Sequence, residues 1–161
     1  MGKQRVTLEK YEFEIAKFVG QARNNSAMAK GSKDHFTLRK GEESEDLHII
    51  GACGEVAVAK YLNIFWDGSV NTYKTSPDLK PSLEVKTTRN PEGDLYIKNH
   101  ESLEQRFILV ARGVKDKFAV WDIVGWFNGV DAPPYITENI DGKSCYKVPK
   151  EKLHDIKELL I

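Results

Sequence analysis

Polar and apolar positions alternate most regularly between residues 83 and 88. The odd positions of this segment carry Leu, Val and Thr, whereas the even positions carry Glu84, Lys86 and Thr88. Because successive side chains of a strand face opposite sides of the sheet, the pattern predicts a strand with one apolar face and one charged face. Residues two apart on one face lie about 6.6 Å from each other. Glu84 and Lys86 are therefore expected to reach a common point above the sheet.

Two longer segments, residues 7–30 and 45–62, show the periodicity of amphipathic helices. The second begins in a cluster of acidic residues, which a helix N-terminus favours. It also contains Gly51 and Gly54 together with Ala52, Ala57 and Ala59, and these small residues predict close packing of the helix onto a sheet. The expected apolar face of the first helix consists of Leu8, Phe13, Ile15, Ala16, Phe18, Val19, Ala22 and Met28.

Shorter apolar segments predict the rest of the sheet. Strands are expected at residues 62–66, 70–74, 95–97, 107–111, 118–126 and 146–148. Short helices are expected at residues 100–106 and 149–160, with a loop between 128 and 145. A chain of 161 residues can bury a sizeable core but is too small for two ordinary domains. The pattern therefore predicts one domain with a mixed α/β core.

Composition restricts the class of protein. Hydrophobic residues make up 40% of the chain and charged residues 30%, which is typical of a globular rather than a disordered protein. No apolar run approaches the roughly 20 residues that span a bilayer. The N-terminus lacks the apolar core of a secretory signal. Cys53 and Cys145 share no metal-type spacing, so we expect reduced thiols in a cytoplasmic protein.

The charges sum to zero, which argues against binding to DNA by electrostatics alone. Their distribution is uneven. Residues 1–40 hold nine Lys and Arg against four Asp and Glu, a balance of +5, whereas residues 41–55 hold five acids and no base. The basic part, including the loop at 30–40, could contact phosphates beside an acidic metal site, or could be ordinary surface charge. The sequence leaves both interpretations open.

A second carboxylate precedes the alternating strand. Asp78 follows a proline six residues before Glu84, and residues 80–82 between them predict a turn. An acid two residues before a lysine occurs four times in the chain, but only Glu84 and Lys86 lie in an alternating strand behind a Pro-Asp. Two carboxylates and a lysine that converge at a strand pair suit a divalent cation that assists phosphodiester hydrolysis.

These residues carry a resemblance to a known family. Pro77-Asp78 followed by Glu84-Val85-Lys86 resembles the signature of the PD-(D/E)XK nuclease superfamily, and Glu55 resembles the additional acidic residue on its preceding helix. The similarity covers about residues 45–125. It implies an α/β fold with a restriction-endonuclease-like core, in which helices flank a central mixed β-sheet.

The resemblance also implies a role for each site residue. Asp78 and Glu84 would bind Mg²⁺ or Mn²⁺, and the backbone carbonyl of Val85 would be a further ligand. Glu55 would either bind the metal or hold a metal-bound water. Lys86 would hold that water or stabilise the negative transition state. The implied activity is Mg²⁺-dependent hydrolysis of DNA phosphodiester bonds. Two departures from the family pattern stand out: the tight turn that the short spacing of the two acids requires, and the lack of a second lysine or glutamine placed beside Lys86.

The same resemblance implies an organisation and partners. A single nuclease-like domain, 1–161, would comprise an N-terminal helical extension (1–44), a catalytic core (45–126) and a C-terminal loop and helix (127–161). DNA is the expected partner, and no membrane is expected. Because a lone active site cuts one strand, the small chain is expected to form a homodimer or to be a subunit of a larger assembly. A phage or mobile-element origin would fit a compact stand-alone nuclease.

Other interpretations of these residues remain open. Glu84 and Lys86 could form only an exposed salt bridge, which contributes about 0–1 kcal/mol. The chain could be a nuclease-fold protein that binds nucleic acid or a protein partner without cleaving it, or an unrelated α/β protein.

Several further side chains allow two interpretations each. His48 lies seven residues before Glu55, so it projects from a similar helix face and could belong to the site or to the surface. Thr87 and Thr88 could assist in binding the phosphate. A group of aromatic residues could stack on bases or pack in the core; these are Trp121, Trp126 and Phe127.

Overall fold

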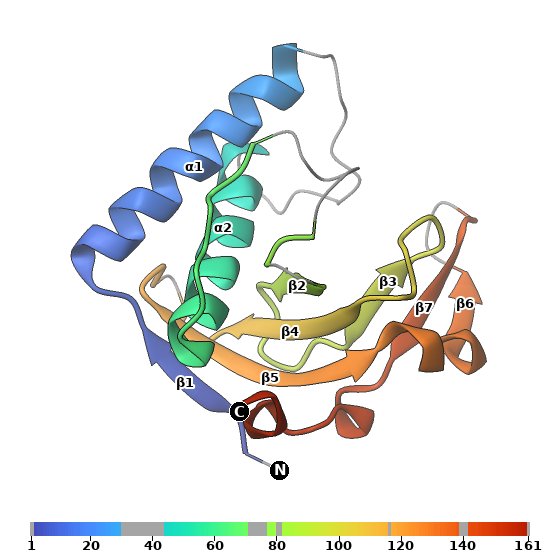
Figure 1. Cartoon of the computed structure of the whole chain (residues 1–161). Helices are drawn as coiled ribbons and strands as arrows, with labels where there is room; N and C mark the ends of the chain where they lie inside the picture. The colour runs from blue at the N-terminus through green and yellow to red at the C-terminus, as the bar shows by residue number, and fades with distance from the viewer. Residues whose placement is uncertain are drawn as a thin grey trace.

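The structure, a computed structural model, describes residues 2–29, 44–70, 77–79, 82–115, 117–138 and 142–160 (Figure 1). The elements in chain order are β1 (Gln4–Thr7), α1 (Lys10–Ala29), α2 (Ser44–Leu62), β2 (Leu83–Thr88), β3 (Leu95–Lys98), β4 (Arg106–Arg112), β5 (Val120–Asn128), β6 (Ile136–Glu138) and β7 (Ser144–Val148). Short 3₁₀ helices follow β5 at Gly129–Asp131 and Pro133–Tyr135, and follow β7 at Lys150–Lys152 and Ile156–Leu159. The predicted mixed α/β class is confirmed.

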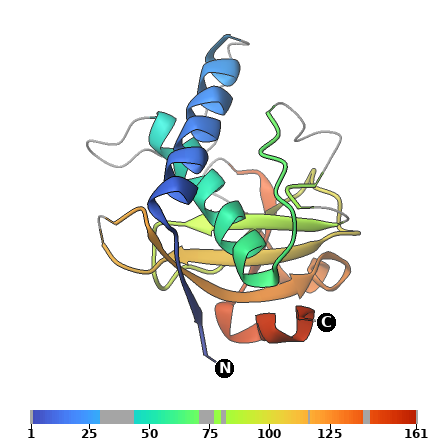
Figure 2. The same cartoon turned by 60° about the vertical axis from the view of Figure 1, so that its left-hand side comes forward.

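The strands form two sheets. In the mixed sheet the order is β1-β5-β4-β2, with β2 parallel to β4 and the other neighbours antiparallel. The second sheet, in the order β3-β7-β6, is antiparallel. Both helices lie on one face of the mixed sheet, with α2 against the strands and α1 packed on α2 (Figures 1 and 2). The second sheet covers the other face, so helices cover only one side.

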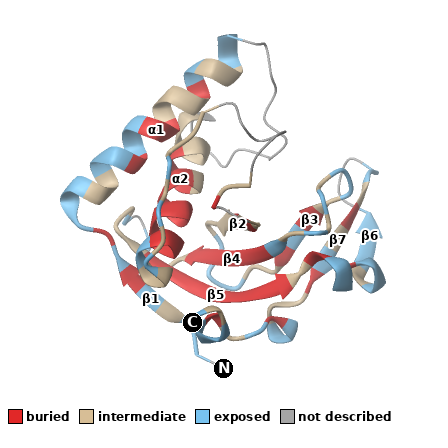
Figure 3. Cartoon of the chain, in the orientation of Figure 1, coloured by how far each residue is buried: buried red, intermediate tan, exposed pale blue. Residues whose placement is uncertain are grey.

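Two hydrophobic cores therefore share the mixed sheet. On β4, Ile108 and Val110 belong to the core under α2, whereas Phe107 and Leu109 belong to the core under the second sheet. This alternation follows from the period of two along a strand. Because β4 is buried on both faces, its sequence is continuously apolar (Figure 3). The run Phe107–Ala111 predicted such a strand, and this prediction is confirmed.

The helices pack closely through two glycines. A Cβ on Gly20 of α1 would lie 2.6 Å from the Cα of Ile49 on α2. A Cβ on Gly54 of α2 would lie 1.9 Å from Oγ1 of Thr87 on β2. Side chains at either position would collide with their neighbours. The predicted close approach of the second helix to the sheet is therefore confirmed at Gly54. This contact holds α2 against β2.

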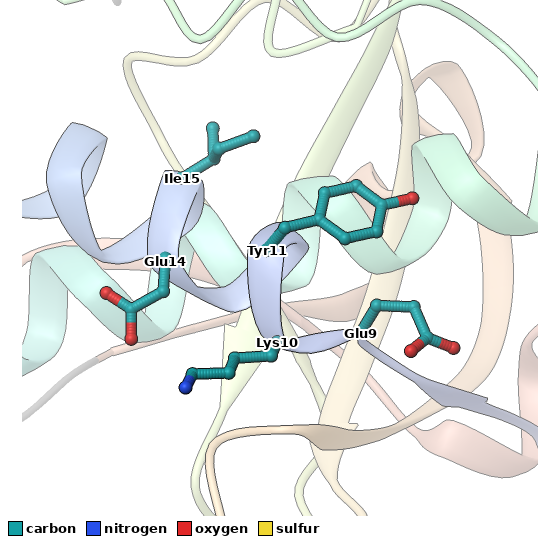
Figure 4. Close-up of a pocket in the computed structure, with 5 residues that line it drawn as sticks. All are labelled: Glu9, Lys10, Tyr11, Glu14 and Ile15. Atoms are coloured by element: carbon teal, nitrogen blue, oxygen red, sulfur yellow. The ribbon is translucent and has the colours of Figure 1, made fainter.

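The expected apolar face of α1 is only partly buried. Ala16 and Val19 face α2, as predicted. Ile15, Phe18 and Met28 are exposed instead, because α1 contacts the rest of the molecule along a narrow stripe centred on Gly20. A hollow on this exposed surface is lined by Glu9, Lys10, Tyr11, Glu14 and Ile15 (Figure 4).

The strand at 83–88 and the hairpin of β4 and β5 were predicted correctly, but several other elements were not. Residues 62–66 end α2 and continue as irregular chain. Residues 100–105 form turns and irregular chain before β4 begins at Arg106, and residues 149–160 contain two short 3₁₀ helices rather than one helix. The N-terminal segment begins with β1, which precedes the predicted helix. Most of the predicted strand 70–74 lies outside the described residues.

Within the described ranges, no helix combines the length and the apolar character needed to cross a membrane.

Candidate functional site

The candidate site lies at the open edge of β2. Among the described residues, β2 is the last strand of the mixed sheet and pairs with β4 on one side. On its other side the chain folds back, and Leu79 forms an antiparallel bridge with Leu83. The backbone groups of these two residues exchange N–H···O bonds of 3.0 and 2.9 Å. The tight return that the short spacing of the two acids required is therefore present.

This return places Asp78 against the middle of β2. The backbone N–H of Val85 donates to Oδ2 of Asp78 at 2.8 Å. The N–H and C=O of one strand residue point to the same edge of the strand. The carbonyl of Val85 therefore faces the open edge, on the side of Asp78. The structure therefore brings together the carboxylate of Asp78 and the carbonyl of Val85, the two groups that the sequence analysis assigned to one metal site.

Glu84 joins the same cluster from the face of β2 that is turned away from α2. Its Oε2 lies 3.4 Å from the backbone nitrogen of Asp78. Burial, followed by the charges of Glu55 and Glu84, raises the pKa of Asp78 well above its usual value. Burial also raises the pKa of Glu84, and the charge of Lys86 opposes that shift. Burial thus destabilises the ionised form of both acidic groups, which identifies them as candidates for function.

Lys86 lies beside Glu84 on this face, where its ammonium group forms an ion pair with Oε1 of Glu101. The ammonium also lies 5.9 Å from the ring centroid of Phe107. Burial, followed by the charge of Lys86, lowers the pKa of Lys98, so a second lysine lies near the first. Neither Glu101 nor Lys98 was predicted from the sequence, because Lys98 ends β3, Glu101 lies in the turn after it, and no motif links these residues to β2.

Glu55 occupies a different position from the one expected of a metal ligand. It is 5% exposed on α2, where Nη1 and Nη2 of Arg23 donate to its two oxygens at 2.6 and 3.0 Å. The indole N–H of Trp66 donates to the same carboxylate at 3.0 Å. Both oxygens therefore have protein partners, although the charge of Glu55 still acts on Asp78. Arg23 and Trp66 were not predicted as partners of Glu55, since they lie outside the helix that carries it.

The donor set suits a hard divalent cation. Asp78 and Glu84 offer carboxylate oxygens, and the carbonyl of Val85 faces the same edge. Mg²⁺ binds through one or two carboxylates and keeps several waters, so this set is sufficient. Across the described part of the chain, no group of three or more His, Cys, Asp or Glu side chains is placed to hold a metal ion. Glu55 is directed toward Arg23 and does not complete such a group.

The aromatic candidates lie in the core. Trp121 has no exposed surface, and Trp126 and Phe127 are 9% and 5% exposed. The stacking interpretation is therefore wrong for this structure, and the packing interpretation is confirmed. His48 lies on α2 and is partly exposed, so both interpretations of this residue stay open. The basic loop at 30–40 lies outside the described residues.

We expect Asp78→Asn to raise the free energy of unfolding at neutral pH, because burial penalises the ionised carboxylate of the wild type and raises the pKa of Asp78. The raised pKa means that the folded state of the wild type binds the Asp78 proton more tightly than the unfolded state does. The ionised group therefore costs stability above its folded pKa, and this cost disappears as the pH falls toward the unfolded value near 4.

Urea unfolding of both proteins across that range checks this prediction. The advantage of the variant should shrink as the pH falls. An advantage that is constant or grows toward acid pH would contradict it.

Comparisons with known proteins give no relative: the chain matches no family model, no curated protein and no solved structure.

Proposed function

We propose that this protein is a metal-dependent nuclease that hydrolyses DNA phosphodiester bonds. The observation that carries the proposal is the cluster at the β2 edge. There, Asp78 and Glu84 share a site that raises the pKa of both, beside Lys86 and the outward-facing carbonyl of Val85. If Glu84 and Lys86 formed only a structural salt bridge, the pair would not require a second carboxylate, that of Asp78, whose ionised form is destabilised at the same place.

Each residue of the cluster has a role in this proposal. Asp78 and Glu84 would hold Mg²⁺ or Mn²⁺ through their oxygens, with the carbonyl of Val85 as a third protein ligand. The chemistry that the bound ion supplies is a lowered pKa of water and stabilisation of charge on the phosphate. Lys86 would donate to the phosphate oxygens or to the attacking water, and its fixed charge would stabilise the transition state. Glu55 would act through Arg23, which it holds near Asp78.

The proposal includes the finer fold and the partners. The restriction-endonuclease-like core would correspond to α2, the returning segment at 77–79, and β2 with β4. DNA would be the partner, and a second copy of the chain would allow both strands of a duplex to be cut. A cytoplasmic location belongs to the same proposal.

A second candidate is a nuclease-fold protein that binds nucleic acid or a protein without cleaving it. The observation in its favour is that Glu55 is fully committed to Arg23 and Trp66. In this candidate the carboxylates at the β2 edge would be remnants of a former site, and affinity for DNA would be independent of divalent metal.

The test is cleavage of labelled single-stranded, duplex, flap and four-way-junction DNA by the wild-type protein in Mg²⁺, in Mn²⁺ and in EDTA. We expect cutting of at least one of these substrates in either metal and none in EDTA. The preferred substrate would then define the type of nuclease. Salt-sensitive binding in EDTA without cutting in metal would favour the second candidate instead. If the protein neither cuts nor binds DNA, both candidate functions are excluded.

A further inference from the structure

We propose that Glu101 is a positioning residue for Lys86: the turn after β3 holds a carboxylate that fixes the lysine ammonium above the β2 edge. This inference rests on the proposed nuclease function, and it assigns to the site a residue from outside the motif. Two observations carry it, namely the way the turn holds Glu101 and the way Glu101 holds Lys86.

The turn fixes the Glu101 carboxylate from its own backbone. The N–H of Glu101 donates to the carbonyl of Lys98 at 3.1 Å, which closes the turn. In return, the N–H of Lys98 donates to Oε2 of Glu101 at 2.7 Å. One carboxylate oxygen is thereby used to fix the side chain, and the other, Oε1, accepts from the Lys86 ammonium. Since Glu101 is held at both ends, it can act as a rigid support for a flexible partner.

Lys86 needs such a support, because its side chain has four rotatable bonds and its ammonium is a point charge without a fixed direction. The nearest carboxylate on its own strand face is Glu84, two residues away. An ammonium paired with Glu84 would occupy the oxygens that the metal needs. The ion pair with Glu101 places the ammonium toward β3 instead and leaves Glu84 available. An ammonium has three donors, so one bond to Glu101 leaves two for a phosphate or a water.

The surroundings of the pair agree with this role. The side chains of Lys86 and Glu101 are 25% and 14% exposed, so the pair is shielded from most of the solvent yet still reachable from the β2 edge. The Phe107 ring beneath the ammonium limits its movement toward the core. Lys98 adds a second cation nearby, so the group as a whole is not dominated by the negative charge of Glu101.

The test compares Glu101→Gln and Glu101→Asp with the wild type in steady-state DNA cleavage, with Glu104→Gln as the matched control. Glu104 lies three residues further along, is exposed, and undergoes the same loss of charge. The Gln variant keeps an oxygen for the Lys98 N–H but loses the ion pair. We expect kcat to fall about 10- to 100-fold in Glu101→Gln with KM for DNA changed by less than about threefold, as for other residues that orient a catalytic group. Glu101→Asp should recover part of this loss, and Glu104→Gln should match the wild type.

A second readout is independent of cleavage. The ammonium signal of Lys86 in ¹H–¹⁵N spectra should be protected from exchange in the wild type and lost in Glu101→Gln, while stabilisation by Mn²⁺ in thermal melts persists in both. Unchanged or increased kcat in Glu101→Gln, in a wild type that cleaves, would overturn the positioning role and leave the proposed function standing. A wild type that shows no metal-dependent cleavage would overturn the proposed function, and the inference with it.

Discussion

Glu84→Ala and Lys86→Ala are each expected to lower metal-dependent DNA cleavage by about 100- to 1,000-fold, the usual effect of removing a group that stabilises transition-state charge. The Glu84→Ala variant loses the carboxylate oxygens that would bind the metal, whereas the Lys86→Ala variant loses the cation that would face the phosphate. Neither change should unfold the protein. The charge of Glu84 already costs stability in the folded state, since its pKa is raised, and the aliphatic part of Lys86 covers only a limited surface.

The two variants should differ in metal binding, which separates their roles. Thermal melting with increasing Mn²⁺ should show stabilisation of Lys86→Ala, as of the wild type, because the carboxylates are intact. Glu84→Ala should show little or none. Exposed residues of the 3₁₀ helix Lys150–Lys152 supply controls: Glu151→Ala and Lys152→Ala should cleave like the wild type. Cleavage that survives both site substitutions would exclude the proposed chemistry.

Arg23→Met is expected to lower the free energy of unfolding by about 3–5 kcal/mol, because it leaves a buried carboxylate without its cation. Glu55 would keep only the N–H of Trp66, and the bond from Nε of Arg23 to the carbonyl of Ser69 would be lost as well. The double variant with Glu55→Gln removes the unpaired charge and should recover at least about half of the loss, as expected for residues coupled by contact. Urea unfolding of the wild type, both single variants and the double variant measures this coupling.

The chain contains a matched control for this pair. Arg5 also forms a two-bond contact with a carboxylate, at 2.9 and 3.2 Å to Asp122, but its side chain is 57% exposed. Arg5→Met should therefore cost less than Arg23→Met, because the Arg5 guanidinium is screened by solvent, although its partner Asp122 is nearly as buried as Glu55. Equal losses in the two variants would contradict the interpretation that burial, rather than pairing alone, makes Arg23 important.

The sequence predicted the parts of the site that depend on local pattern. Alternation over 83–88 placed Glu84 and Lys86 on one face, and the short spacing to Asp78 required the chain to return along β2, as it does. Small residues in the second helix predicted its close approach to the sheet, and Gly54 makes that contact.

The remaining site residues depend on contacts between distant segments. Arg23 is 32 residues from Glu55, and Glu101 is 15 residues from Lys86. Neither residue belongs to a repeating pattern, so only the packing of α1 on α2 and the turn after β3 place them. In the second sheet, β3 and β7 match the strands predicted at 95–97 and 146–148, whereas β6 was missed for a similar reason. β6 is short, exposed and preceded by two prolines, so its sequence has no apolar signal and it is a strand only because β7 pairs with it.

The position of β1 in the mixed sheet has a consequence for synthesis of the chain. Within the part of the chain that the structure describes, β1 pairs with β5 alone, and Arg5 and Asp122, which are 117 residues apart, lie opposite each other. At the usual 5–20 residues per second, β5 leaves the ribosome about 6–25 s after β1. Both helices can form during that interval, because their hydrogen bonds are local. Until β5 appears, the backbone of β1 has no strand partner, so this edge of the sheet can close only late in translation.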